Sequence, residues 1–261
     1  MCLIYVYCIS TGIKQNEVTI RNISISNIRI VDIVQYNNIQ AVVSRVSDVE
    51  FEDEAIRKYL ENPEWVKEKA LIHEDIIEEI MENYSVLPMR FLTIYNTEQN
   101  LLEFLKNHYE KILDNLMVAE MNIEYSVRVY CNKEILKKAL MEEEEIKTEI
   151  EVIASKPKGV AYMLMKKLNE RIAVSIQNNL NCDAQDIYKA IESISEKIMM
   201  NEFQKSDESL IEKIFNVVIL INRENYLNKI HKIEKLNEEY SEKGYHIEAS
   251  GPWPIYNFIN I

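Results

Sequence analysis

The chain has 261 residues, of which 47% are hydrophobic, and its formal net charge is −13. A chain of this length can bury a sizeable core and favours two domains. The acidic balance argues against binding to nucleic acid or to an anionic membrane, because both need clustered Lys and Arg. A soluble surface kept apart by repulsion explains the charge more simply than a basic partner does.

The cysteines and the hydropathy pattern predict a cytoplasmic protein. Cys2, Cys8, Cys131 and Cys182 form no C-x-x-C pair, and we interpret them as buried thiols, neither disulfides nor metal ligands. No apolar run approaches the ~20 residues of a membrane span. The first residues, MCLIYVYCIS, lack the charged region of a signal peptide and lead into a strand pattern.

The first half of the chain predicts strands followed by helices. Strands are expected at 3–9 and 39–46, and one or two more within 17–34. A helix begins at Asn62-Pro63, because Asn caps the first turn and Pro fits the first helical position. Its apolar face consists of Val66, Ala70, Ile76, Ile77, Ile80, Met81 and Tyr84.

An extended piece at 86–91 and a second helix complete the first predicted domain, 1–121. The helix begins at Thr97, and the sequence places a linker near 119–123. The residues on the inner side of this helix are Leu101, Leu105, Tyr109, Ile112, Leu116 and Met117.

The second half alternates strands and helices. In chain order we expect a strand at 124–131, a helix from Lys133 into the acidic run MEEEEIKTEIE, a weak strand near 149–154, a break at 156–159, a long helix over 160–200, a central strand at 214–222, a helix at 223–243 and a strand from Tyr245. This order predicts a ferredoxin-like βαββαβ domain over 122–261, with a helical insertion at about 156–205 and a tail at 250–261. The fold class is therefore α+β with two domains.

Two details of the helix at 223–243 are specific enough to check. Gly244 suits the left-handed position just after the helix. The inward residues are expected to be Leu227, Ile230, Ile233 and Leu236.

Residues typical of catalysis are scarce. The chain has four Gly and no phosphate-binding glycine motif or nucleophile elbow. His73-Glu74 resembles the start of a zinc motif, but Ile77 stands where the second ligand would be. We expect no catalytic activity, cofactor or metal, and we place His73 at the edge of a buried helix face.

Three residues outside the terminus are candidates for binding. Arg90 either is buried with an acidic partner beside a pocket or points out of the sheet into solvent, and we favour the second arrangement. Tyr162 and Met163 lie on the long helical segment, whose apolar face exceeds what its own sheet needs. Met residues on this segment fill the core or contact a partner, and core filling is the simpler interpretation.

The stretch SGPWPIYNF, residues 250–258, contains one of the four Gly, two of the five Pro and one of the two Trp of the chain. Gly251 is expected to turn the chain after the final strand, and Pro252 and Pro254 to stiffen it. The aromatic side chains Trp253, Tyr256 and Phe258 either fasten the tail to the protein's own body or anchor a partner. We favour the first function, because large aromatic residues contribute most when buried.

Seven stretches, in order along nearly the whole chain, resemble the gas vesicle protein F/L family. These are IYVYCI (4–9), IQAVVSRV (39–46), EWVKEKALIHEDII (64–77), VLPMRFLTIY (86–95), EYSVRVYC (124–131), KGVAYMLMKK (158–167) and SGPWPIYNF (250–258). The sequence departs from the family pattern at Cys8 and Leu92, where the family usually has Gly. F-type and L-type are not distinguished.

The resemblance implies an accessory or minor structural protein of gas vesicles, without catalytic activity. It also implies an N-terminal α+β domain, a ferredoxin-like C-terminal domain with extra helices, and contact with the small hydrophobic shell protein and other accessory proteins. The sequence leaves two alternative functions open. One is a ligand-sensing ferredoxin-like regulatory protein, and the other is an enzyme in which Arg90, His73 and nearby carboxylates converge on a cleft.

Overall fold

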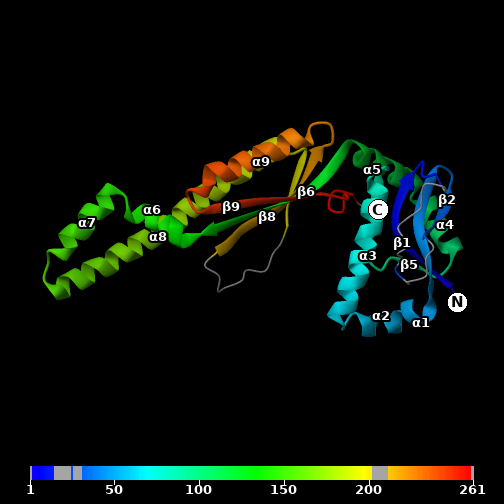
Figure 1. Cartoon of the computed structure of the whole chain (residues 1–261), viewed down its shortest axis with the longest axis horizontal. Coiled ribbons are helices and arrows are strands. Elements are labelled where there is room, and N and C mark those ends of the chain that lie inside the picture. Colours follow the sequence, from blue (N-terminus) through cyan, green and yellow to red (C-terminus); the bar gives the residue numbers. More distant parts are fainter. Residues whose placement is uncertain (1, 15–24, 26–30, 202–210, 260–261) are drawn as a thin grey trace. The chain divides into compact units, whose positions relative to one another are not determined.

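The computed structural model describes residues 2–14, 25, 31–201 and 211–259. The chain forms two compact units (Figure 1): the first comprises Met1–Glu124 and Pro252–Ile261, and the second comprises Tyr125–Gly251. The predicted boundaries, 1–121 and 122–261, differ from this division chiefly at the C-terminal tail, which belongs to the first unit.

The first unit contains an antiparallel sheet centred on β1. Its strands are β1 (Cys2–Thr11), β2 (Val31–Tyr36), β3 (Ile39–Ser47), β4 (Val86–Pro88) and β5 (Ile94–Tyr95). The strand order is β2-β3-β1-β4, and β5 also pairs with β1. The strands expected at 3–9 and 39–46 are confirmed. Most of 17–34 lies outside the described residues, and its end forms the start of β2.

Helices cover both faces of β1. Figure 1 shows α3 and α4 on opposite sides of this sheet. Leu3, Tyr5 and Tyr7 pack in one core cluster with Ile76 and Ile77 of α3. The alternate residues of β1 are also buried, which explains why the strand is apolar at successive positions rather than at every second one.

The helices of the first unit are α1 (Asp48–Phe51), α2 (Asp53–Tyr59), α3 (Pro63–Met81), α4 (Glu98–Asn107) and α5 (Tyr109–Met121). The Asn62 side chain accepts hydrogen bonds from the first turn of α3, as predicted. The single helix expected from Thr97 is instead two helices, since the backbone leaves helical geometry at His108. Met117, predicted to face inward, is 55% exposed. No linker follows, because β6 begins directly after α5.

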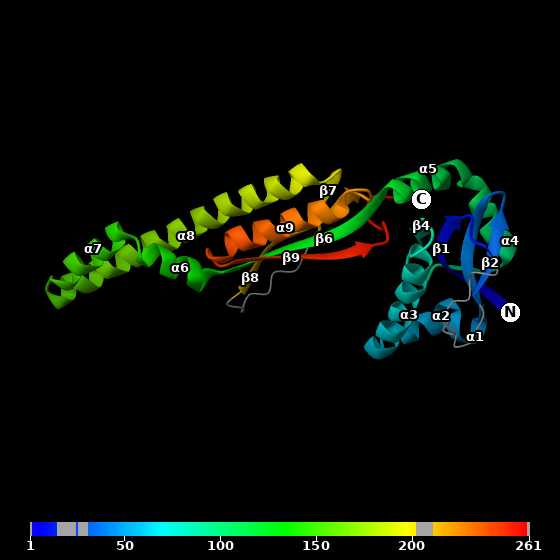
Figure 2. The same cartoon turned by 45° about the horizontal axis from the view of Figure 1, so that its top comes forward.

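The second unit is a four-stranded sheet with helices against it (Figure 2). Its elements are β6 (Asn122–Asn132, whose first residues belong to the first unit), α6 (Lys133–Met141), α7 (Glu144–Ala154), α8 (Lys158–Ile194), β7 (Lys197–Met200), β8 (Ile211–Asn222), α9 (Tyr226–Ser241) and β9 (Tyr245–Trp253, which runs into the first unit). The strand order is β7-β8-β6-β9.

Two predicted elements of this unit are wrong. The stretch 149–154 is the last part of α7 and not a strand. The helix predicted to continue towards Met200 ends at Ile194, and the strand that follows, β7, pairs with β8. The four strands therefore include β7 in place of the strand expected at 149–154.

The helices α7 and α8 form a hairpin with its own small core. In Figure 2, α7 lies beside the first part of α8, beyond the ends of the strands. Ile153, Leu168 and Ile172 are buried there, and Ile146 and Ile150 pack against them. Much of the apolar face that seemed excessive for the sheet is therefore covered by α7.

Several smaller expectations can be settled in the described residues. Cys8 and Cys131 are buried as predicted, but Cys2 and Cys182 are exposed. Leu227, predicted to face inward, is 69% exposed because it lies in the first turn of α9. Gly244 has a φ of +91°, and a Cβ there would meet the Asn132 carbonyl oxygen at 3.0 Å, so glycine is required.

Candidate functional site

The C-terminal tail is fastened to the first unit by residues in its middle. Pro254 and Ile255 are buried, and the Tyr256 ring packs against the core cluster of β1 and α3. The Tyr256 hydroxyl donates to Glu74 Oε1 of α3 at 2.9 Å. Burial raises the pKa of both groups, so the carboxylate that accepts this bond is itself partly desolvated.

Glu124 provides the second attachment of the tail. This carboxyl group is only 3% exposed, and Asn257 donates to both of its oxygens. The Asn257 backbone N–H lies 2.9 Å from Oε2, and its Nδ2 lies 2.6 Å from Oε1. Burial raises the pKa of Glu124, whereas the Asn257 hydrogen bonds favour the ionised form. The buried acid is therefore satisfied only while the tail is in place.

The predicted aromatic anchors of the tail differ in their surroundings. Tyr256 and Phe258 are both half-buried, and Tyr256 packs against the core cluster of β1 and α3. Trp253 keeps 38% of its surface exposed, and Pro252 beside it is exposed. The hydrogen bonds that attach the tail come from Tyr256 and Asn257, and a fastening function for Trp253 stays a prediction. Gly251, expected to turn the chain, instead lies within β9.

Arg90 is carried by a tight turn after β4. Its carbonyl oxygen accepts from the backbone N–H of Thr93 at 3.0 Å and from the Thr93 hydroxyl at 2.6 Å. Leu92 within this turn has a φ of +64°, a left-handed conformation that is costly for a residue with a branched side chain. This conformation explains why glycine suits the position of Leu92.

A buried hydrogen-bond chain holds this turn. The backbone N–H of Leu92 donates to the Tyr5 hydroxyl at 3.2 Å, and that hydroxyl lies 2.9 Å from His73 Nδ1. His73 Nε2 lies 3.0 Å from the Met89 carbonyl oxygen. Because a carbonyl only accepts, Nε2 carries the proton and Nδ1 accepts from Tyr5. Burial lowers the pKa of His73 to about 4, which keeps the ring neutral.

His73 therefore lies in the middle of the buried face of α3 rather than at its edge. It is 0% exposed, and both of its ring nitrogens are hydrogen-bonded.

Arg90, in contrast, is exposed as predicted. It lines a cavity of about 510 Å³ together with Met89, Thr93, Phe104, Tyr256 and Asn257. His73 is not among the described lining residues, so the enzyme alternative lacks the convergence of Arg90 and His73 that it requires.

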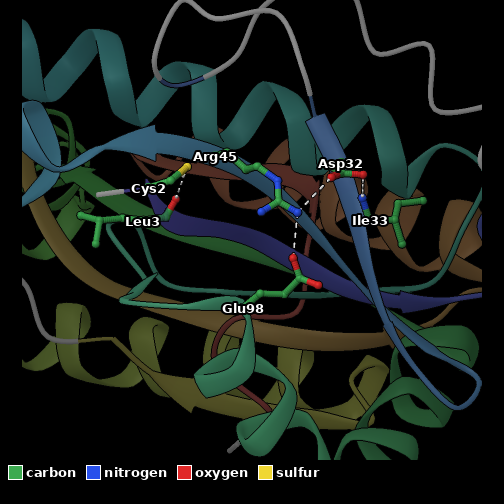
Figure 3. A network of polar contacts seen from close by, with 6 residues as sticks. All are labelled: Cys2, Leu3, Asp32, Ile33, Arg45 and Glu98. Carbon is green, nitrogen blue, oxygen red and sulfur yellow. Dashed lines mark hydrogen bonds and ion pairs between the residues drawn. The ribbon is translucent and has the colours of Figure 1, made fainter.

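A separate polar network of exposed side chains connects the first sheet with α4 (Figure 3). Arg45 of β3 pairs with Glu98 of α4 at 2.7 Å and with Asp32 of β2 at 3.6 Å. Each of these side chains keeps at least a third of its surface in solvent. The network connects two strands and a helix, and its exposure limits its contribution to stability.

Tyr162 and Met163 lie on the first turns of α8, in the second unit. Tyr162 is 75% exposed and Met163 is 65% exposed. Val160 on the same helix and Val152 at the end of α7 are also about half exposed, at 48% and 51%. The hairpin end thus carries several uncovered apolar side chains, while Leu164 and Met165 point into the hairpin core.

The described helices include none that is long and apolar enough to cross a membrane.

Comparison with protein families matches residues 3–260 to the family described as "Gas vesicle synthesis protein GvpL/GvpF". The chain belongs to this gas vesicle family. Two relatives come from Streptomyces sp. (strain CB03234). Gas vesicle protein L is 20% identical over 88% of this chain and 83% of its own length, and gas vesicle protein F is 25% identical over 72% and 76%.

Solved structures of GvpF share the fold. The crystal structure of GvpF from Anabaena sp. PCC7120 matches with a TM-score of 0.70 at 14% identity, over 100% of this chain and 97% of that one. The structure from Microcystis aeruginosa matches with a TM-score of 0.67, also at 14% identity, over the full length of both chains. The α+β class with two antiparallel sheets is therefore that of GvpF.

The residues that sequence reasoning missed are Tyr5, Glu74, Glu124 and Asn257. Glu124 carried a usable signal, because an acidic residue within an apolar strand needs a buried donor. Asn257 lies inside the tail stretch 250–258, in which the aromatic residues are the more prominent pattern. Nothing in the sequence indicated that these two residues, 133 positions apart, form a pair.

Proposed function

We propose that this gas vesicle protein is a cytoplasmic accessory or minor structural protein that binds the small hydrophobic shell protein and supports vesicle assembly, without catalysis. Other vesicle accessory proteins are its further partners. The proposal rests on family membership and on one observation, the uncovered apolar end of the α7–α8 hairpin.

The hairpin end has the properties of a surface for an apolar partner. Tyr162 and Met163 are adjacent and largely exposed, and Val160 precedes them on the same helix. Flexible Met side chains adapt to varied apolar surfaces, and Tyr offers a large apolar ring with a polar tip. The hairpin keeps its own core beneath them, so these side chains are available without unfolding the helices.

Charge supports a holding function. A shell subunit that exposes apolar surface before assembly is prone to aggregate. A carrier with a net charge of −13 keeps a complex soluble through repulsion between complexes. Contact through a few exposed side chains allows the subunit to be released into the growing shell.

Replacement of the hairpin side chains tests this proposal. Tyr162→Asp with Met163→Asp is compared with Leu227→Asp, a matched control because Leu227 is also exposed on a helix of the second unit. We expect the double variant to lose its ability to keep co-expressed shell protein soluble, and cells that carry it to form fewer vesicles. Equal shell-protein solubility with the double variant, the control and the parent protein would reject this surface. Circular dichroism checks that each variant is folded.

We also propose that the second unit is a ferredoxin-like domain with α6–α8 as an enlarged first crossover. The order β6, α6–α8, β7, β8, α9, β9 and the strand order β7-β8-β6-β9 support this assignment. A ligand-sensing regulatory protein remains the alternative, and a thermal-shift screen against metabolites tests it. Stabilisation by one metabolite, without any effect on shell-protein solubility, would favour the sensor.

A further inference from the structure

We propose that the cavity beside Arg90 binds an acidic peptide segment of a partner protein. The segment would place a carboxylate on the Arg90 guanidinium and an apolar neighbour against Phe104 and Met89. This surface belongs to the first unit and is separate from the hairpin end of the second unit.

The charge of the cavity favours an anion. Arg90 is the only charged side chain among the described residues that line it. In the described part of the chain, no acidic side chain forms an ion pair with Arg90. The planar guanidinium is suited to bidentate pairing with a carboxylate. The chain has 43 acidic and 30 basic residues, yet this exposed Arg in a cavity pairs with no acidic side chain of residues 2–14, 25, 31–201 and 211–259.

Hydrogen bonds to buried and half-buried side chains hold the backbone turn and the tail residues that line the cavity. The turn that bears Arg90 is held by Tyr5 and His73, at the cost of the left-handed backbone at Leu92. Strained backbone that is held by its surroundings is typical of functional sites. The tail residues that line the cavity, Tyr256 and Asn257, are held by hydrogen bonds to Glu74 and Glu124. A ligand would therefore meet a preorganised site.

The lining favours a peptide over a small anion. Sites for phosphate or small dicarboxylates usually combine several donors or cations. This cavity offers one cation, the Thr93 and Asn257 side chains already engaged in other hydrogen bonds, and the apolar surfaces of Met89 and Phe104. Its volume of about 510 Å³ lies within the range of ligand sites. Glu74 and Glu124 are not among the described residues that line the cavity, and both accept hydrogen bonds from the tail.

Peptide capture by the immobilised full-length chain tests the proposal. The probes are two synthetic libraries of short peptides with a central apolar–Glu–apolar or apolar–Gln–apolar sequence. Arg90→Gln removes the cation, and Arg57→Gln is the matched control, because Arg57 is an exposed Arg on α2. We expect the parent chain and Arg57→Gln to retain Glu peptides about tenfold better than Gln peptides. Arg90→Gln should retain both equally and poorly.

Three outcomes would overturn the proposal. The first is equal retention of the Glu and Gln libraries by the parent chain, including no retention of either. The second is an undiminished preference for Glu peptides in Arg90→Gln. The third is displacement of bound Glu peptides by succinate or inorganic phosphate at concentrations below that of the peptide, which would identify a small anion as the ligand. A shell-protein assay on Arg90→Gln separates this site from the hairpin, since we expect no change there.

Discussion

The buried ring of His73 is expected to contribute less to the stability of the first unit in mild acid than at neutral pH. Burial lowers its pKa from 6.5 to about 4. Between these values the unfolded chain binds a proton that the folded chain does not. The free energy of unfolding therefore falls as the pH decreases through 6.5 and continues to fall until about pH 4. Above pH 6.5 the contribution of His73 is fully present.

The two pKa values set the size of the effect. Integration of the proton linkage from about pH 7.5 to about pH 5 gives a loss of about 2 kcal/mol from this residue. The raised pKa values of Glu74 and Glu124 act in the opposite direction. For a carboxyl group with a raised folded-state pKa, stability is greatest at low pH and is lost as the pH rises. These contributions are shared by all variants and cancel in a comparison.

Urea unfolding at both pH values measures this difference. The Trp253→Phe background leaves Trp65, in α3 of the first unit, as the only fluorescent tryptophan. His73→Gln retains a donor and an acceptor but does not titrate, and His231→Gln is the control because His231 is exposed. We expect the control to lose about 2 kcal/mol more than His73→Gln on acidification. An equal loss in the two variants would refute the argument.

Three further predictions concern backbone and polar contacts of the first unit. Leu92→Gly should be more stable than Leu92→Ala by about 1 kcal/mol in urea unfolding, because only glycine adopts the left-handed conformation without cost; the reverse order would contradict backbone strain. Asn257→Ala should destabilise by about 1–3 kcal/mol, because Glu124 loses its side-chain donor, and unchanged stability would show that water replaces it. Arg45→Gln should cost less than about 1 kcal/mol despite the 2.7 Å pair with Glu98, because the pair is exposed; a larger loss by calorimetry would contradict this.

Sequence patterns within a short window correctly predicted those helices and strands that are determined by their own residues. The start of α3 follows from Asn62 and Pro63, and the alternation of β6 places Val127, Val129 and Cys131 in the core. These features depend on capping and on a period of two, both of which are visible in a short window.

The errors arose where partners distant in the chain decide the structure. Residues 149–154 alternate like a strand, but Ile146, Ile150 and Ile153 also share one helical face, and packing against α8 selects the helix. The change from α8 to β7 occurs at Ser195-Glu196, without Gly or Pro to mark it. The apolar spacing continues through this point, so pairing with β8 decides it.

The candidate site was predicted only in part, for the same reason. The exposure of Arg90, Tyr162 and Met163 agrees with a surface function, but their neighbours could not be read from the sequence. The tail contacts of Glu74 and Glu124 span 182 and 133 positions. No local pattern encodes such pairs, because their cause is the topology of the whole unit.

The division of the chain also has a consequence for biosynthesis. The first unit is interrupted at Glu124 and resumes at Pro252, after the whole second unit. A ribosome therefore translates the complete insertion before Tyr256 and Asn257 emerge to cap the carboxylates of Glu74 and Glu124. Until then, a nascent first unit carries an uncapped acid in its interior, and prematurely terminated products should be preferred substrates for proteases.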